Sequence, residues 1–168
     1  MRNKKVLFIT QAAVIAALYV VLTQFANMLG LANGAIQVRF SEALTILPFF
    51  TPAAIPGLAI GCFLSNVLTG CAVYDIIFGT IATLIGAVGT YLLRRFKWLA
   101  PVPPIVANTI IVPWVLRLVY EAPGTIWYLM ITVGAGEVIS CGILGMILLF
   151  ALSHYRSVIF PDTQNGAN

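Results

Sequence analysis

Long apolar stretches dominate the chain, and short breaks rich in glycine, proline or charge separate them. The stretches cover residues 6–31, 41–69, 74–95, 101–120 and 125–153. A helix needs about 20 apolar residues to cross the roughly 30 Å hydrocarbon core of a bilayer. Each stretch therefore predicts at least one membrane-spanning helix, and the fold class predicted is an all-α integral membrane protein.

The second stretch contains three closely spaced prolines, Pro48, Pro52 and Pro56. A proline inside a helix removes a backbone hydrogen bond and clashes with the preceding turn. We expect the chain to turn back here, which gives a short second helix; a re-entrant structural turn is the alternative. The prediction is one transmembrane domain over residues 1–168 with six helices, at about 6–31, 41–50, 53–69, 74–95, 101–120 and 125–153.

Basic residues fall unevenly on the two sides of this arrangement. One side receives Arg2, Lys4, Lys5, Arg94, Arg95, Lys97 and Arg156. The other side receives Arg39 and Arg117. Cytoplasmic loops of membrane proteins carry an excess of Lys and Arg, so both termini are predicted to be cytoplasmic. A single crossing over 41–69 would instead place the 94–97 cluster outside.

The composition excludes several function classes. With 61% hydrophobic and 8% charged residues, the chain has too few charges to cover a soluble domain of its size. The net charge of +4 comes from basic residues at the ends of apolar stretches, so nucleic-acid binding is not expected. No phosphate-binding loop is present, and the single histidine, His154, has no neighbouring metal ligand. The protein is predicted to be no enzyme and to need no cofactor or metal.

Acidic residues concentrate in the exterior half of the predicted bundle. That half receives Glu42, Asp75, Glu121 and Glu137, whereas Asp162 falls in the C-terminal tail. Two basic residues cannot balance four carboxylates there. An acidic cavity that opens outward favours a cationic or donor-rich small molecule. Glu121 lies four residues after Arg117 in a loop, where a solvated pair explains it better than a ligand does.

Glu137 is the strongest candidate binding residue. It lies well inside the last apolar stretch, where a carboxylate is costly and usually faces a protein interior or a wet cavity. Its neighbours at helical spacing, Gly134 and Cys141, are small enough to let a ligand or another helix approach. A buried structural partner such as Arg117 is the alternative.

Asp75 and Glu42 are predicted to lie at helix starts. Asp75 begins a face of small residues and is a candidate binding residue, although an acid is also favoured at a helix N-terminus for electrostatic reasons. Glu42 follows Arg39 by three residues and Ser41 by one. Ligand binding and local pairing with capping are equally compatible with that spacing.

Two asparagines and two tryptophans complete the candidate binding set. Asn66 and Asn108 place amides in apolar stretches, where they must hydrogen-bond either a ligand or another helix. Trp114 and Trp127 fall toward the exterior side and are candidates for stacking on a flat ligand. Both also fit the belt of aromatic residues at a membrane interface.

Small residues mark two packing surfaces. Ala12, Ala13, Ala16 and Ala17 form a smooth stripe near the cytoplasmic end of the first helix. Close approach of a partner helix needs such residues, so the stripe is a predicted partner interface. The Gly57–Gly61 pair has the G-x-x-x-G spacing of helix packing.

Four segments resemble one known family. They are "VRFSEALTILPFF" (38–50), "SNVLTGCAVYDIIFGTIATLIG" (65–86), "VANTIIVPWV" (106–115) and "VGAGEVIS" (133–140). In these segments the chain resembles the membrane S-components of energy-coupling factor (ECF) transporters, and within them the queuosine-precursor family known as QueT. The resemblance implies a six-helix S-component fold that captures queuine or a related 7-deazaguanine from outside, beneath the first loop.

The resemblance also implies partners and an assignment of roles. The partners would be a membrane coupling subunit (EcfT-like) and two cytoplasmic ATPases, contacted through the alanine stripe. A carboxylate can accept the paired N–H donors of a guanine-like edge, and a second can bind an aminomethyl cation. Our hypothesis gives Glu137 the edge and Asp75 the amine, although the roles can be exchanged. An S-component for another vitamin-like cation, a small cation channel or proton-coupled carrier, and a structural membrane protein remain alternatives.

Overall fold

The computed structural model describes residues 4–31 and 37–159, and every regular element in this part of the chain is helical. Arg2 and Asp162 lie outside the described residues. In chain order the elements are α1 (Lys4–Met28), η1 (Phe40–Phe49), α2 (Ala54–Leu68), α3 (Val73–Leu92), η2 (Lys97–Leu99), α4 (Val102–Leu118), α5 (Ile126–Glu137), η3 (Val138–Leu144), α6 (Gly145–His154) and α7 (Arg156–Ile159).

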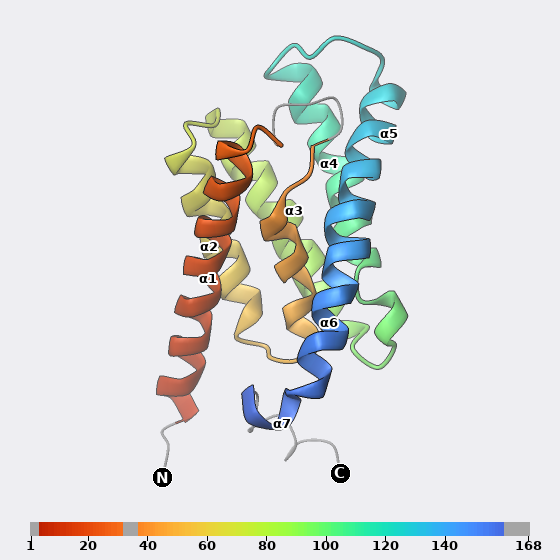
Figure 1. Ribbon diagram of the computed structural model, residues 1–168. Helices are drawn as coiled ribbons and strands as arrows, with labels where there is room; N and C mark the ends of the chain where they lie inside the picture. Colours follow the sequence, from red (N-terminus) through yellow and green to blue (C-terminus); the bar gives the residue numbers. More distant parts are fainter. Residues whose placement is uncertain (1–3, 32–36, 160–168) are drawn as a thin grey trace.

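Four helical segments are long and apolar enough to cross a membrane. They are Lys4–Met28, Val73–Leu92, Lys97–Leu118 and Ile126–His154. The shorter apolar helices η1 and α2 lie between the first and second of them along the chain. Each of the six segments predicted from the sequence thus contains a helix. The start of α1, the connection between α3 and α4, and α7 lie at the same end of the bundle (Figure 1).

The short element η1 occupies the centre of the bundle. It contacts α1, α2, α3, η3 and α6, and all side chains from Ser41 to Phe49 are buried. It is a 3₁₀ helix rather than the α-helix that the sequence predicted. Because a 3₁₀ helix rises about 2 Å per residue, it extends further than an α-helix of equal length. Irregular backbone of this kind is tolerated at membrane depth when protein surrounds it.

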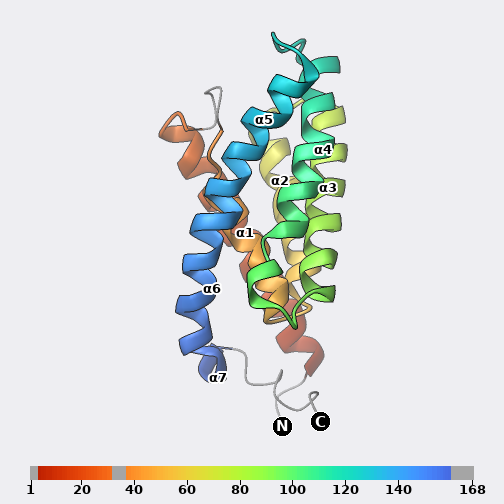
Figure 2. The same ribbon diagram turned by 90° about the vertical axis from the view of Figure 1, so that its right-hand side faces the viewer.

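The last long helix is continuous from Ile126 to His154 but changes geometry in its middle. Residues Val138–Leu144 form the π-helical segment η3 between α5 and α6. Figure 2 shows α5 and α6 as one curved rod, in which α5 lies beside α4 and α6 lies away from α3 and α4. Glu137, predicted inside a regular helix, is in fact the last residue of α5, directly before the π segment. π-Helical turns frequently mark functional sites.

Helices α1 and α2 pack closely through small residues. A Cβ atom added to Gly57 would lie 2.7 Å from the carbonyl oxygen of Ala12, and one added to Gly61 would lie 3.0 Å from that of Ala16. The predicted partner stripe is therefore divided. The backbone of Ala12 and Ala16 lies against α2, and Ala16 is buried; their assignment to an external partner stays a prediction. Ala13 and Ala17 are exposed on α1.

Replacing Gly61 with alanine is expected to separate α1 from α2 and lower the stability by about 1–3 kcal/mol. The added methyl group would meet Tyr19 Cβ at 2.7 Å as well as the backbone of Ala16. The midpoint of thermal unfolding in detergent measures the change. Ala17→Leu adds more volume on the exposed face of α1 and serves as the control, with an expected effect within about 0.5 kcal/mol. Equal midpoints for Gly61→Ala and the wild type would contradict this packing.

Candidate functional site

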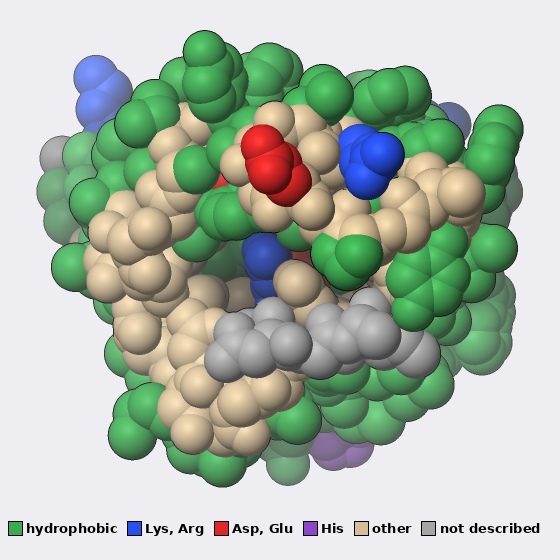
Figure 3. Space-filling view, turned by 90° about the horizontal axis from the view of Figure 1, so that it is seen from above, with side chains coloured by type: hydrophobic (Ala, Val, Ile, Leu, Met, Phe, Trp, Pro, Cys, Tyr) green, Lys and Arg blue, Asp and Glu red, His purple; other side chains and the backbone are tan. Residues whose placement is uncertain are grey.

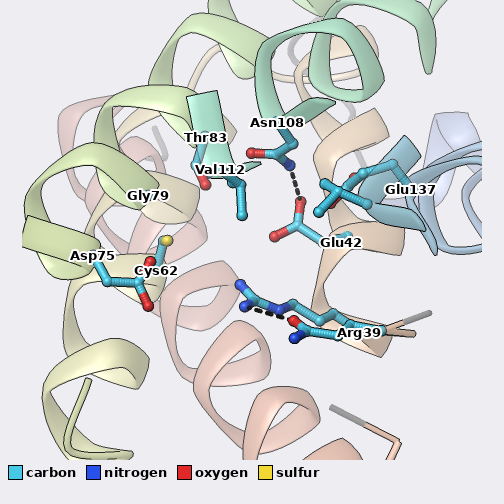
Figure 4. A pocket seen from close by; sticks show the side chains of 11 residues that line it. Arg39, Glu42, Cys62, Asp75, Gly79, Thr83, Asn108, Val112 and Glu137 are labelled. Carbon is cyan, nitrogen blue, oxygen red and sulfur yellow. Dashed lines mark hydrogen bonds between the residues drawn. The ribbon is translucent and has the colours of Figure 1, made fainter. Parts of the chain in front are cut away.

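Polar side chains from five elements and one connecting segment converge on a small inner pocket (Figure 4). Asp75 and Cys62 lie on one side of it, and Arg39 and Glu137 reach in from the other. Its free volume of about 20 Å³ is close to the space of a single water molecule. The residues that line this inner pocket are Gln37, Arg39, Glu42, Cys62, Asp75, Gly79, Thr83, Asn108, Val112, Val133 and Glu137.

Glu42 is held by hydrogen bonds from two neighbouring helices. Its carboxylate accepts one from the Tyr19 hydroxyl of α1 at 2.5 Å and one from the Asn108 amide of α4 at 3.4 Å. The side chain is 2% exposed. Ser41, the predicted cap, instead accepts a hydrogen bond from Thr23 of α1 at 2.9 Å. Glu42 is therefore a buried interhelical acceptor and not part of a local capping arrangement.

Glu137 lies beside Glu42 and shares a neighbour with it. The Cys141 thiol donates to Glu137 Oε2 at 3.2 Å and approaches the Glu42 carbonyl oxygen at 3.4 Å. Three possible metal-ligand atoms, a carboxylate oxygen of Glu42, one of Glu137 and the Cys141 sulfur, lie within 4.8 Å of one another. These three atoms could hold a cation, and two adjacent carboxylates could equally accept a pair of N–H donors. Arg117, the alternative partner for Glu137, is exposed and donates to the Ala122 carbonyl oxygen.

Asp75 lies in the first turn of α3, across the pocket from Glu137. Its Oδ2 accepts a hydrogen bond of 2.9 Å from the Tyr120 hydroxyl, which in turn accepts one of 3.0 Å from the Ala72 N–H. Burial, followed by the nearby Asp75 carboxylate, raises the pKa of Tyr120 to about 12. The Tyr120 hydroxyl thus stays protonated at neutral pH and continues to donate to Asp75.

A larger hollow of about 640 Å³ leads toward the inner pocket from the end of the bundle away from the termini. Figure 3 looks onto this end and shows an opening with a basic side chain inside it. We call this hollow the vestibule. Gln37, Arg39 and Asp75 line both the vestibule and the inner pocket. The other residues that line the vestibule are Thr23, Gln24, Ala26, Asn27, Asn66, Thr69, Cys71, Leu116 and Tyr120.

The structure brings together four of the seven candidate binding residues. These are Glu42, Asp75, Asn108 and Glu137, and all four line the inner pocket. Asn66 lines the vestibule instead, with its amide 3.7 Å from Cys62 Sγ.

The two tryptophans lie outside these two hollows, and their assignment as stacking residues stays a prediction. Trp114 is 49% exposed and lines an apolar groove together with residues of α3 and α4, and Trp127 is 71% exposed on α5. Neither lines the inner pocket or the vestibule. Their positions fit the alternative interpretation, an aromatic belt at the membrane interface.

Among the residues of the site that sequence reasoning missed are Tyr19, Arg39, Cys141 and Tyr120, which contact the acids or line the pocket. The sequence did give a signal for Arg39, because it is one of two basic residues in the exterior half of the predicted bundle, which holds four acids. Cys141 was noted as a small neighbour of Glu137 but not as its donor. Tyr19 and Tyr120 gave no signal, since nothing in an apolar helix or a loop tells which tyrosine reaches a distant carboxylate.

The protein is a helical bundle that crosses the membrane several times and encloses a buried acidic pocket beneath a vestibule. This architecture is typical of a small-molecule transport protein. The model of the QueT transporter family matches residues 9–154. The chain belongs to the QueT transporter family and is a multi-pass protein of the bacterial membrane.

One curated relative is the queuosine precursor transporter QueT of Lactococcus lactis subsp. cremoris (strain MG1363). It is 39% identical to this chain over 98 residues. The similar region covers 58% of this chain and 57% of the relative, less than two thirds of its length. No solved structure matches the chain.

Proposed function

We propose that the protein is the substrate-binding S-component of an ECF-type importer and captures queuine or a related 7-deazaguanine from outside the cell. The observation that carries this proposal is the convergence of Glu42, Asp75, Glu137 and Asn108 on one pocket. Buried carboxylates are costly unless partners compensate them, and the hydrogen bonds from Tyr19, Asn108, Cys141 and Tyr120 leave some of their acceptor positions open. A ligand rich in donors would supply the rest.

The proposed orientation follows from charge. The start of α1 and the connection between α3 and α4 lie at one end of the bundle (Figure 1), and this end carries the basic residues Lys4, Lys5, Arg94, Arg95 and Lys97. Because cytoplasmic loops are enriched in Lys and Arg, we assign this end, with both termini, to the cytoplasm. The six helices then form a single transmembrane domain whose vestibule opens to the exterior.

The proposed contacts match two features of a 7-deazaguanine. A guanine-like edge presents adjacent N–H donors, and Glu137 beside Glu42 offers carboxylate acceptors for them. The aminomethyl nitrogen of the ligand carries a positive charge near neutral pH. Asp75 lies across the pocket and at its boundary with the vestibule, and in this proposal it binds that charge. Asn108 adds an amide between them, and Asn66 lies along the route inward.

The proposed partners are a membrane coupling subunit and two cytoplasmic ATPases. Ala13 and Ala17 are exposed on α1, so a partner helix could approach this face closely. Ala12 and Ala16 would support that face from inside by fixing α1 on α2.

Titration of queuine into the purified protein, followed by calorimetry near pH 7, tests the substrate. The wild type is expected to bind, and a folded Glu137→Gln variant is expected to bind at least about 30-fold more weakly, since the amide N–H₂ replaces one acceptor oxygen and would face a donor of the ligand. Glu121→Gln changes an exposed acid and is the control. A folded wild type that binds neither queuine nor its aminomethyl precursor contradicts the substrate, and equal affinity of Glu137→Gln contradicts the role of Glu137.

Replacing Tyr120 with phenylalanine is expected to weaken queuine binding by about tenfold, the value of one hydrogen bond to a charged group. The change removes the donor to Asp75 Oδ2 and the acceptor of the Ala72 N–H. Tyr74→Phe, at an exposed tyrosine of the apolar groove, is the matched control. Equal affinities for Tyr120→Phe and Tyr74→Phe in the same titration would show that Tyr120 does not position Asp75.

A further inference from the structure

Arg39 stands at the boundary between two hollows of very different size. It lines the vestibule of about 640 Å³ and also the inner pocket of about 20 Å³. Small-molecule sites usually enclose about 300–1,000 Å³, so the vestibule can hold a bicyclic ligand whereas the inner pocket cannot. Figure 4 shows the Arg39 side chain extending across the space between Glu42 and Asp75. Something at this boundary must move before a ligand reaches Glu42 and Glu137.

The backbone around Arg39 is fixed at several points. The Arg39 N–H donates to Ser140 Oγ of η3 at 3.1 Å, and the Val38 N–H donates to the Leu31 carbonyl oxygen at 3.1 Å. The Gln37 carbonyl oxygen approaches Gly136 of α5 so closely that a Cβ atom there would overlap it. The backbone of residues 37–39 therefore lies docked against the continuous α5–η3 helix.

The side chain of Arg39 is held far less firmly than its backbone. Within the described part of the chain, its guanidinium makes one hydrogen bond, to Gln37 Oε1 at 3.4 Å. Glu42, Asp75 and Glu137 line the same pocket, yet none of these described carboxylates lies within ion-pair distance of it. The guanidinium is thus attracted by three acids without a fixed partner. A rotation about its side-chain bonds would cost little hydrogen bonding.

We propose that the Arg39 side chain is the inner gate of this site. In the empty protein the guanidinium supplies positive charge to the three acids and blocks the passage from the vestibule. A ligand that carries its own positive charge replaces that charge, and the side chain rotates away while the backbone of residues 37–39 stays docked. This inference rests on the proposed function in taking the inner pocket as the binding site, but the passage can be tested without any ligand.

Two cysteines report on the two sides of the proposed gate. Cys62 lines the inner pocket and is 2% exposed, whereas Cys71 lines the vestibule and is partly exposed. The probe is methyl methanethiosulfonate, a small thiol reagent without charge. Because it is neutral, a change in the electrostatic potential of the site does not alter its local concentration. Modification of each cysteine over time is followed by peptide mass spectrometry in the full-length protein in detergent. The rate at Cys71 serves as the internal reference.

Arg39→Gln is expected to raise the rate of Cys62 modification at least about tenfold relative to Cys71, because access limits the reaction of a buried thiol. Arg39→Lys, with a slimmer cation, is expected to give an intermediate rate. Arg117→Gln removes an exposed arginine, and Ser140→Ala removes the backbone anchor while keeping the guanidinium. Both controls are expected to stay within about threefold of the wild type. Loss of a positive charge disfavours the thiolate, so a faster reaction reports access.

Two results would overturn the proposal. One is an unchanged Cys62 rate in Arg39→Gln, or in Arg39→Lys where the glutamine variant does not fold. The other is an equal acceleration in Ser140→Ala, which would make backbone movement the opening step. Since no ligand takes part, failure of queuine to bind leaves this measurement interpretable, and a failed gate leaves the titration interpretable.

Discussion

Replacing Glu42 with alanine is expected to abolish detectable queuine binding and to lower the stability by about 1–3 kcal/mol. The carboxylate is the shared acceptor of Tyr19 from α1 and Asn108 from α4. Its removal leaves both donors buried without that acceptor, although it also relieves repulsion with Glu137. Calorimetric titration measures the binding, and the midpoint of thermal unfolding in detergent measures the stability.

Glu42→Gln separates the two roles of this residue. A glutamine still offers an oxygen to the Tyr19 hydroxyl, so the fold is expected to survive. Its amide N–H₂ would face donors of the ligand, so the affinity for queuine is expected to fall at least about 30-fold, or 2 kcal/mol. Glu121→Gln, in the exposed loop after α4, is expected to bind like the wild type. Wild-type affinity in Glu42→Gln would mean that Glu42 is only a structural acceptor for α1.

Replacing Gly136 with alanine is expected to undock residues 37–39 from α5. The new methyl group would overlap the carbonyl oxygen of Gln37, which belongs to the backbone and cannot rotate aside. Overpacking of this kind costs about 1–3 kcal/mol. Because Gln37 and Arg39 line the inner pocket, the affinity for queuine is also expected to fall by about tenfold. Thermal unfolding and titration of the same preparation measure the two effects together.

Gly142→Ala is the matched control in the same continuous helix. A Cβ atom at Gly142 would meet Val138 Cγ1 at 3.7 Å and Ile105 Cδ1 at 3.8 Å, both ordinary contacts. Alanine also favours a helix over glycine by up to about 1 kcal/mol. The control is therefore expected to keep the wild-type stability or exceed it. If Gly136→Ala and Gly142→Ala behave alike, the docking of Gln37 on α5 does not hold the pocket together.

Energetic cost explains which parts of the site the sequence could predict. A carboxylate such as Glu137 inside an apolar stretch costs so much free energy in a membrane that a functional role is expected. In the structure it lies in a polar pocket. The prolines of the second stretch similarly predicted a short second helix, which is η1. Both signals come from residues that hydrocarbon does not tolerate. They needed no knowledge of neighbouring helices.

Direction around a helix explains what the sequence could not predict. Trp114 and Asn108 both belong to α4, yet one lines an apolar groove and the other the inner pocket. Successive residues of an α-helix point about 100° apart, and an almost uniformly apolar helix gives no amphipathic pattern from which to choose a face. For the same reason the alanines of α1 could be recognised as a packing surface, but not divided into those that lie against α2 and those that are exposed.

The π segment changes the direction in which the side chains of α6 point relative to those of α5. Upstream of it, Glu137 faces the inner pocket; downstream, Phe150 packs edge-on against Trp98, with 5.4 Å between ring centroids. A π turn accommodates one more residue than an α turn, which is equivalent to a rotation of about 100° between the two halves of the rod. Deletion of one residue from Val138–Leu144 would keep the helix continuous but rotate α5 relative to α6. Glu137 could then face the inner pocket, or Phe150 could pack against Trp98, but both contacts could not form together.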